Sequence, residues 1–182
     1  MYSFIKINLI FLLPFFMCNT YDFNPNSINY LKSEGVNDNT IKLDKVAFLE
    51  LNDVELNHVK KSPVWRNFTQ EGSQIKAKSG FHIVTGKMKN GGKLSVILKN
   101  QKNDKNSIDF TPYFSIVSET PHFILYCSCG SNVSHSTGDG CFTYATAGSG
   151  LVCGGQCSGD NAGSTCSFTI LNLVTGQTTA PM

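Results

Sequence analysis

The sequence predicts an α+β fold in which two short N-terminal helices precede a mainly antiparallel β-sheet and a disulfide-rich C-terminal segment. Three observations support this prediction. Helix-capping residues mark residues 52–68, apolar residues alternate with a period of two from residue 74 onward, and six cysteines fall between Cys127 and Cys166. With 182 residues, of which 41% are hydrophobic, the chain is large enough for one domain with its own core.

The N-terminus has the pattern of an export signal. A single early lysine precedes an apolar run at residues 7–17, which is shorter than the roughly 20 residues that span a bilayer but suits a signal-peptide core. Cleavage after Thr20 is acceptable because Cys18 and Thr20 are small. A lipoprotein acylated at Cys18 is the alternative, which the large Met17 disfavours. We expect residues 1–20 to be a signal peptide and the mature chain to be secreted, periplasmic or at the cell surface, without a transmembrane helix.

Changes in composition divide the rest of the chain. Residues 21–45 are polar, rich in asparagine and weakly patterned, which predicts a linker. Residues 46–126 carry the helical and alternating patterns of the α+β domain. Residues 127–182 are rich in Cys, Gly, Ser and Thr, and their only Asp, Glu, Lys or Arg side chains are Asp139 and Asp160. This last segment is either a separate module or the final strands of the same sheet.

Capping residues predict the two helices at the start of the domain. In segment 52–61, Asn52 is a capping residue, acidic residues occupy the first turn and two lysines occupy the last, which complements the helix dipole. Ser62-Pro63 then supplies a cap and a proline at the first helical position. A second short helix is therefore expected at residues 64–68, with Gly72 as its stop.

Alternating apolar residues predict the strands. Asn90-Gly91-Gly92 predicts a hairpin turn, because glycine and asparagine adopt positive φ angles most readily. In the strand after it, at residues 93–99, Leu94, Val96 and Leu98 would line one face. The other strands are expected at residues 74–78, 80–84, 110–117, 123–129, 141–146 and 166–174.

Clustered cysteines characterise the C-terminal segment and predict three disulfides in an exported chain. Cys127 and Cys129 are two positions apart on an expected strand, so they project from the same face and are poorly placed to bond to each other. Of the fifteen pairings that six cysteines allow, three contain that bond, so twelve remain. The disulfide candidates are Cys127, Cys129, Cys141, Cys153, Cys157 and Cys166.

The same segment raises two alternatives. Thiolate sites for zinc or iron–sulfur clusters usually present Cys-x-x-Cys pairs, whereas the spacings here are Cys-x-Cys and Cys-x-x-x-Cys, which disfavours a metal site with His135 as a further ligand. The motif at residues 155–159 matches a cysteine version of the nucleophile elbow, centred on Cys157. The residues that follow it are too rich in Gly, Ser and Thr to predict the helix that an elbow requires. His135 near Asp139 offers a base and an acid, but catalytic triads are assembled in space rather than along the chain.

Charge and motifs together favour a binding function. A net charge of +2 does not predict nucleic-acid binding, and six lysines around the expected hairpin are typical of a solvated sheet edge. No motif identifies catalytic, cofactor-binding or metal-binding residues. The sequence therefore favours an exported, disulfide-stabilised, non-enzymatic binding or interaction domain, which contacts an unidentified extracytoplasmic partner or surface through the charge-poor region from residue 127 onward. An exported thiolate-metal protein, and a secreted hydrolase or toxin-like effector that uses His135 or Cys157, are the alternatives.

Overall fold

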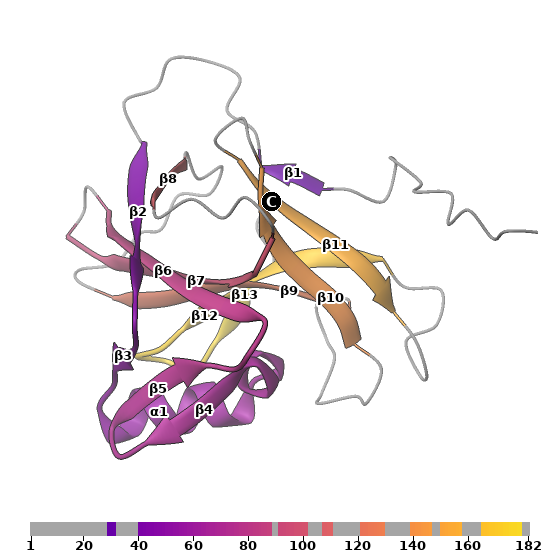
Figure 1. The fold of residues 1–182 in the computed structure, drawn as a ribbon. Coiled ribbons are helices and arrows are strands. Elements are labelled where there is room, and N and C mark those ends of the chain that lie inside the picture. The colour runs from indigo at the N-terminus through magenta and orange to yellow at the C-terminus, as the bar shows by residue number, and fades with distance from the viewer. Residues whose placement is uncertain are drawn as a thin grey trace, which may run out of the picture.

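Most of the described chain forms β-strands, which are accompanied by one α-helix and one short 3-10 helix (Figure 1). The structure is a computed structural model that describes residues 29–31, 40–88, 91–101, 107–110, 121–129, 139–146, 150–157 and 165–179. The helices are α1 (Asp53–Lys61) and η2 (Pro63–Asn67). The strands are β1 (Asn29–Leu31), β2 (Ile41–Val46), β3 (Leu49–Glu50), β4 (Phe68–Glu71), β5 (Gln74–Ala77), β6 (Phe81–Lys87), β7 (Lys93–Lys99), β8 (Ser107–Phe110), β9 (His122–Cys129), β10 (Asp139–Ala145), β11 (Leu151–Cys157), β12 (Cys166–Asn172) and β13 (Thr178–Thr179).

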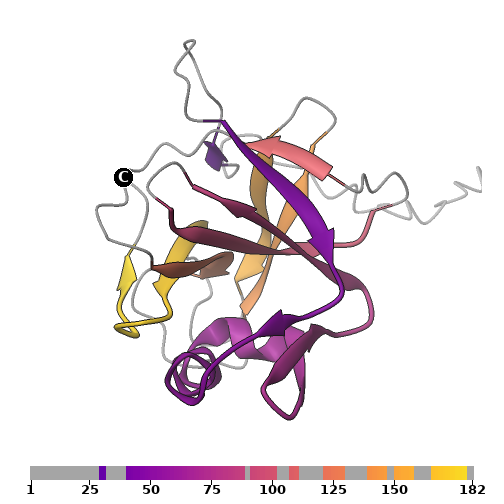
Figure 2. The same ribbon diagram turned by 90° about the vertical axis from the view of Figure 1, so that its left-hand side faces the viewer.

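These strands form three sheets. The central sheet has seven strands in the order β13-β12-β9-β7-β6-β2-β8, the outer sheet has the order β1-β11-β10, and the small sheet has the order β3-β5-β4. Among the described strands, β7 and β9 pair in parallel, and the other neighbours are antiparallel. The outer sheet packs on one face of the central sheet, while α1 and the small sheet pack on the other (Figures 1 and 2).

The central sheet has an apolar core on each face, because successive side chains of a strand point in opposite directions. On β7, Leu94, Val96 and Leu98 are buried against the outer sheet, whereas Ile97 packs toward α1. The alternation predicted for this strand is therefore confirmed. Coverage of both faces also explains why every residue of β9 is buried.

The helix α1 begins and ends where the capping residues predict. The Asn52 side chain accepts hydrogen bonds of 3.0 Å from the backbone N–H groups of Val54 and Glu55, and the Glu55 carboxylate accepts one from the N–H of Asn52. This reciprocal arrangement is a capping box, which satisfies N–H groups that the first turn leaves without helical partners. Leu56 and Val59 bury one face of the helix against the central sheet. None of the described helices has the length and hydrophobicity to cross a membrane.

The prediction of an α+β fold with two short N-terminal helices is wrong, because the described chain is mostly β with a single α-helix. The expected second helix is only η2, a five-residue 3-10 helix. It ends because Phe68 is already extended, with φ −116° and ψ 155°, and pairs with Ala77 as the first residue of β4. Phe68 is buried in the core cluster that also contains the buried face of α1. This burial favours an extended conformation more than the local sequence favours a helix.

Strands also occur where a linker was expected. Within residues 21–45, β1 pairs with β11, and Ile41 and Leu43 of β2 are buried in the core of the central sheet. At the other boundary, β9 begins at His122, before the cysteine-rich segment. Since β9 and β12 are neighbours in the central sheet, residues 127–182 contribute strands to the same sheet as residues 46–126. The expected signal peptide, including Cys18, lies outside the described residues.

Most of the other predicted strands are present. Strands β5, β6, β9, β10 and β12 coincide with the expected ones to within a few residues. The hairpin between β6 and β7 is confirmed, and Gly91 has the positive φ of 84° that its turn requires. Of the strand expected at residues 110–117, only residue 110 is described, as the end of β8.

Candidate functional site

Three disulfides connect the central sheet to the outer sheet. Each has one cysteine on β9 or β12 and the other on β10 or β11, with Cα atoms 5.4 to 5.6 Å apart, as is usual for disulfides. The predicted disulfide framework is therefore confirmed, and the two cysteines of β9 have different partners. The bonds are Cys127–Cys153, Cys129–Cys157 and Cys141–Cys166.

Strand periodicity explains why the cysteines meet. Cys127 and Cys129 lie on the face of β9 that the outer sheet covers, because they are two residues apart. In the central sheet, Cys129 lies directly opposite Cys166 of β12. Their bonding partners, Cys157 and Cys141, lie on neighbouring strands of the outer sheet. Two disulfides are thereby placed side by side.

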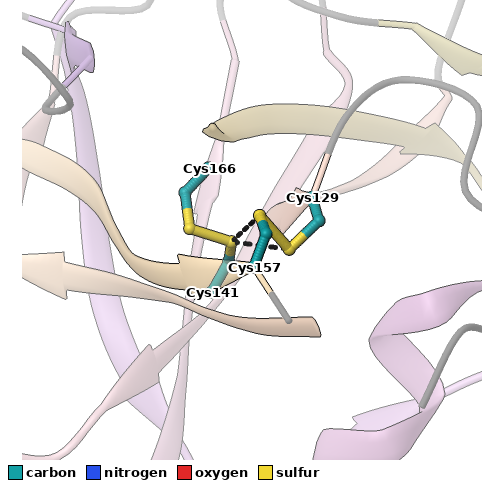
Figure 3. Close-up of side chains that lie close together, drawn as sticks. All are labelled: Cys129, Cys141, Cys157 and Cys166. Atoms are coloured by element: carbon teal, nitrogen blue, oxygen red, sulfur yellow. Dashed lines mark hydrogen bonds between the residues drawn. A yellow bond between two sulfur atoms is a disulfide. The ribbon is translucent and has the colours of Figure 1, made fainter. Parts of the chain in front are cut away.

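These two disulfides form a compact group of four sulfur atoms, which we call the sulfur cluster (Figure 3). Its members are Cys129, Cys141, Cys157 and Cys166, whose Sγ atoms all lie within 4.8 Å of one another. The Sγ of Cys141 is 3.3 Å from that of Cys129 and 3.6 Å from that of Cys157, although it is bonded to neither. Only Cys157 is partly exposed, and the other three cysteines are buried.

The nucleophile-elbow motif does not correspond to an elbow in the structure. Cys157 is the last residue of β11, and its Sγ is bonded to Cys129, so it is not a free nucleophile in this state. Within the motif, residues 158 and 159 lie outside the described part of the chain. His135 also lies outside it, so its suggested pairing with Asp139 stays a prediction.

A second constellation, which the sequence did not reveal, joins three polar residues across the other face of the central sheet. The Oγ of Ser95 lies 3.0 Å from Nε2 of His122, and Nδ1 of His122 lies 3.5 Å from the carboxylate of Glu55. The residues come from β7, β9 and α1. The sequence signal was weak, because Ser95, His122 and Glu55 are far apart in the sequence and form no local motif. The order hydroxyl, imidazole and carboxylate is that of a hydrolase triad.

Burial makes this constellation a structural network rather than an active site. Burial and the positive charge of Lys93 lower the pKa of His122 to about 4, so its imidazole is neutral at neutral pH. A neutral ring can accept a hydrogen bond from the Ser95 hydroxyl at Nε2, while its Nδ1 lies 3.5 Å from the Glu55 carboxylate. Ser95 is only 1% exposed, and it lies on the interior strand β7, so a substrate carbonyl cannot reach its Oγ.

The remaining described histidines also have structural partners. His58 donates from Nδ1 to the backbone carbonyl of Leu173, at 2.7 Å. His82 lies 2.7 Å from the side-chain oxygen of Asn100. Neither side chain contributes to the sulfur cluster or to the Ser95 network.

A pocket of about 490 Å³ opens at the start of α1, lined by residues 52–55 and by Val174. Val54 and Val174 are among its exposed apolar side chains. The N–H groups of Val54 and Glu55, which would otherwise attract an anion, already donate to Asn52. Two of the N–H groups at this helix start are therefore already engaged, and we assign the pocket no function.

Partly exposed aromatic rings form a surface that we call the aromatic patch, defined by Phe81, Phe142, Tyr144 and Lys99. The Phe81 and Phe142 ring centroids are 5.7 Å apart, and the Tyr144 ring meets Phe142 edge to face at 6.4 Å. The Nζ of Lys99 lies 4.0 Å from the centroid of the Phe142 ring. These distances suit aromatic pairing and a cation–π contact.

The outer sheet positions this patch. Phe142 and Tyr144 alternate along β10 with Cys141 and Thr143, so the rings project away from the sulfur cluster. Across the sheet, Phe142 lies opposite Gly154, which has no side chain to cover the rings. The alternation Cys-Phe-Thr-Tyr was a usable sequence signal for this face. What the sequence did not show is that Phe81 and Lys99, from β6 and β7, lie beside it.

Comparison with known proteins does not assign the site, since no protein-family model, curated protein or solved structure matches the chain significantly. The function must therefore be argued from the residues themselves.

Proposed function

We propose that this protein is an exported, disulfide-stabilised, non-enzymatic binding domain, and that its aromatic patch contacts an anionic polysaccharide outside the cytoplasm. The observation that carries the proposal is the contact of Lys99 with the partly exposed Phe142 ring, next to Phe81 and Tyr144. A row of partly exposed rings that carries a cation offers both apolar contact and charge to a ligand.

The chemistry of each group suits a charged sugar polymer. Aromatic ring faces pack against the C–H faces of sugar rings, and the ammonium group of Lys99 attracts carboxylate or sulfate substituents. Partial burial raises the pKa of Tyr144 above its usual value, so its phenol stays neutral and can donate a hydrogen bond to a sugar oxygen.

The disulfides support a binding role because they fix the strands that carry the rings. Cys141 on β10 and Cys153 on β11 are bonded to β12 and β9 on the inner side of the outer sheet. The rings on the other side are thereby held in place before a ligand arrives, which reduces the entropy lost on binding. Disulfides are also typical of proteins in oxidising compartments, in agreement with the export signal proposed at residues 1–20.

Binding to immobilised polygalacturonate tests the proposal, with neutral dextran as the reference polymer. We expect the chain to bind the acidic polymer and not dextran, with an affinity that falls as salt is added. Phe142→Ala and Lys99→Gln should each weaken binding by about tenfold, equivalent to about 1.4 kcal/mol. Far-ultraviolet circular dichroism and a count of free thiols verify that the variants are folded and fully disulfide-bonded.

Matched controls lie elsewhere on the surface. Val174→Ala removes an exposed apolar side chain, and Lys42→Gln removes an exposed lysine on β2, so neither should change binding. Equal binding by Phe142→Ala and the unmodified chain would contradict the assignment of the patch. Failure to retain any of a series of acidic polysaccharides, with retention of a protein ligand instead, would contradict the ligand class.

A further inference from the structure

The two disulfides of the sulfur cluster are in contact with each other. Cys141 Sγ contacts both sulfur atoms of the neighbouring bond, at 3.3 and 3.6 Å, and all four Sγ atoms lie within 4.8 Å of one another. By comparison, a zinc ion bound by four thiolates at about 2.3 Å has tetrahedral sulfur–sulfur separations of about 3.8 Å. The unbonded contacts around Cys141 are therefore already close to the edges of such a tetrahedron.

We propose that reduction of these two disulfides creates a tetrathiolate site for one zinc ion, with Cys129, Cys141, Cys157 and Cys166 as the ligands. Each bonded pair must open from about 2.0 Å to about 3.8 Å, which is a change that side-chain rotations can supply. Zinc is the appropriate metal because it prefers a four-coordinate tetrahedral site with thiolate ligands and has no redox chemistry of its own. The inference concerns the reduced protein and is independent of the ligand of the aromatic patch.

The scaffold explains why the sequence spacing disfavoured such a site. The four ligands come from four strands, β9, β10, β11 and β12, and Cys129 lies opposite Cys166 in the central sheet. Pairing between strands, rather than a Cys-x-x-Cys turn, brings the sulfur atoms together. The third disulfide, Cys127–Cys153, is buried and does not belong to the sulfur cluster.

The partial exposure of Cys157 determines which of the two disulfides is reduced first. A dithiol reductant reaches Cys157 first, because this cysteine is the partly exposed one. Attack of the dithiol on Cys157 Sγ releases Cys129 as a thiolate. The dithiol then closes to a cyclic disulfide and frees Cys157. The Cys129 thiolate, 3.3 Å from Cys141 Sγ, can displace Cys166 and form a Cys129–Cys141 bond. A second dithiol reduces that bond, so two dithiols deliver four electrons and four protons in total.

Charge balance then favours a divalent cation. Zinc replaces the four thiol protons, and a site of four thiolates and one Zn²⁺ has a charge of −2. Arg66 places a guanidinium beside the cluster, since its Nη2 donates to the backbone carbonyl of Cys141 at 2.8 Å. Its positive charge partly offsets that of the site.

Cobalt titration of the reduced full chain tests the proposal, with Cys18→Ser in every protein to remove the seventh thiol. A water-soluble phosphine is the reductant, because it leaves no thiol to compete for metal; water supplies the oxygen of the phosphine oxide that forms. We expect the reduced chain to bind one Co²⁺ with the absorption spectrum of a tetrahedral tetrathiolate site, and Zn²⁺ to displace it. The oxidised chain should bind neither metal.

Variants distinguish this site from unspecific binding to thiols. Cys141→Ser should abolish stoichiometric binding, whereas the double variant Cys127→Ser, Cys153→Ser should retain it. Cys157→His should retain one Co²⁺ with a shifted spectrum, because an imidazole nitrogen can replace a thiolate as ligand and Cys157 is the partly exposed member of the cluster. A reduced chain that binds no metal, folded or unfolded, overturns the proposal. Binding that the Cys127, Cys153 double variant abolishes and Cys141→Ser spares overturns it as well.

Discussion

Arg66 donates a 2.8 Å hydrogen bond from Nη2 to the backbone carbonyl of Cys141 and thereby joins η2 to β10, across 75 residues of sequence. Arg66→Ala should lower the free energy of unfolding by about 2 kcal/mol, because a hydrogen bond with a charged donor is lost and the carbonyl is left with a poorer partner. Urea unfolding with the disulfides intact measures the change. Lys78→Ala is the control, since Lys78 is exposed and should tolerate alanine. Equal stability of both variants would contradict a role for the Arg66 contact.

Two adjacent glycines of β11 should respond differently to alanine. Gly155 has φ of 130°, and a Cβ there would contact the Gly140 carbonyl and lie 3.0 Å from the Cα of Cys141. A Cβ on Gly154 would meet only the Tyr144 ring, at an ordinary 3.6 Å. We expect Gly155→Ala to lower the free energy of unfolding by about 2 kcal/mol and Gly154→Ala to change it by less than about 0.5 kcal/mol. Similar values in urea unfolding would contradict the described backbone of β11.

The buried hydroxyl of Thr143 has no hydrogen-bond partner among the described residues, although the side chain is almost completely buried. Thr143→Val keeps the shape and removes the unpaired group, so it should raise the free energy of unfolding by about 1 kcal/mol. Thr169→Val is the matched control, because the Thr169 hydroxyl pairs with that of Ser128 at 2.9 Å. Thermal unfolding should show a higher Tm for the first variant and a lower Tm for the second. A lower Tm for both would indicate that Thr143 has a partner.

His122 should make stability depend on pH between about 6.5 and about 4. The unfolded side chain has a pKa of about 6.5, whereas burial and Lys93 lower the folded pKa to about 4. As the pH falls through this window, the unfolded chain binds a proton that the folded chain does not bind, so the free energy of unfolding decreases. The full effect is about 3 kcal/mol.

Urea unfolding from pH 7.5 to pH 4 measures this loss in the unmodified chain and in His122→Gln. The variant should be less stable at pH 7.5 but should show a smaller fall toward pH 4, because its residue 122 does not titrate. Nuclear magnetic resonance of the imidazole provides a direct reading. A His122 titration midpoint near 6.5 in the folded protein would refute the expected shift.

Local patterns predicted those parts of the fold that local interactions decide. The capping box at Asn52 and the buried face formed by Leu94, Val96 and Leu98 depend on residues close in sequence, and both are present. The prediction of a second helix was wrong because the conformation of Phe68 depends on its pairing with Ala77 and on its burial against residues distant in the sequence. The sequence did not predict β11 as a full strand, because Gly154 and Gly155 lower its strand propensity. Pairing with β10 stabilises the strand along its whole length.

The candidate sites likewise combine features that local sequence predicts with contacts that depend on the whole fold. The shared face of Cys127 and Cys129 followed from a spacing of two, but the choice among twelve pairings depends on how the outer sheet docks. The aromatic patch and the contact of Ser95 with His122 each require strands that the sequence places far apart. No local pattern encodes such contacts.

The connectivity of the disulfides has a consequence for how the chain matures. The three bonds span 26, 28 and 25 residues, and each one interleaves with the other two. If cysteines paired in their order along the chain, the products would be Cys127–Cys129, Cys141–Cys153 and Cys157–Cys166, none of which is native. Correct oxidation therefore has to follow the docking of the two sheets, or else depend on an isomerase that reshuffles early bonds. By either route, the packing of the two sheets selects the native pairs, and the order of the cysteines along the chain does not.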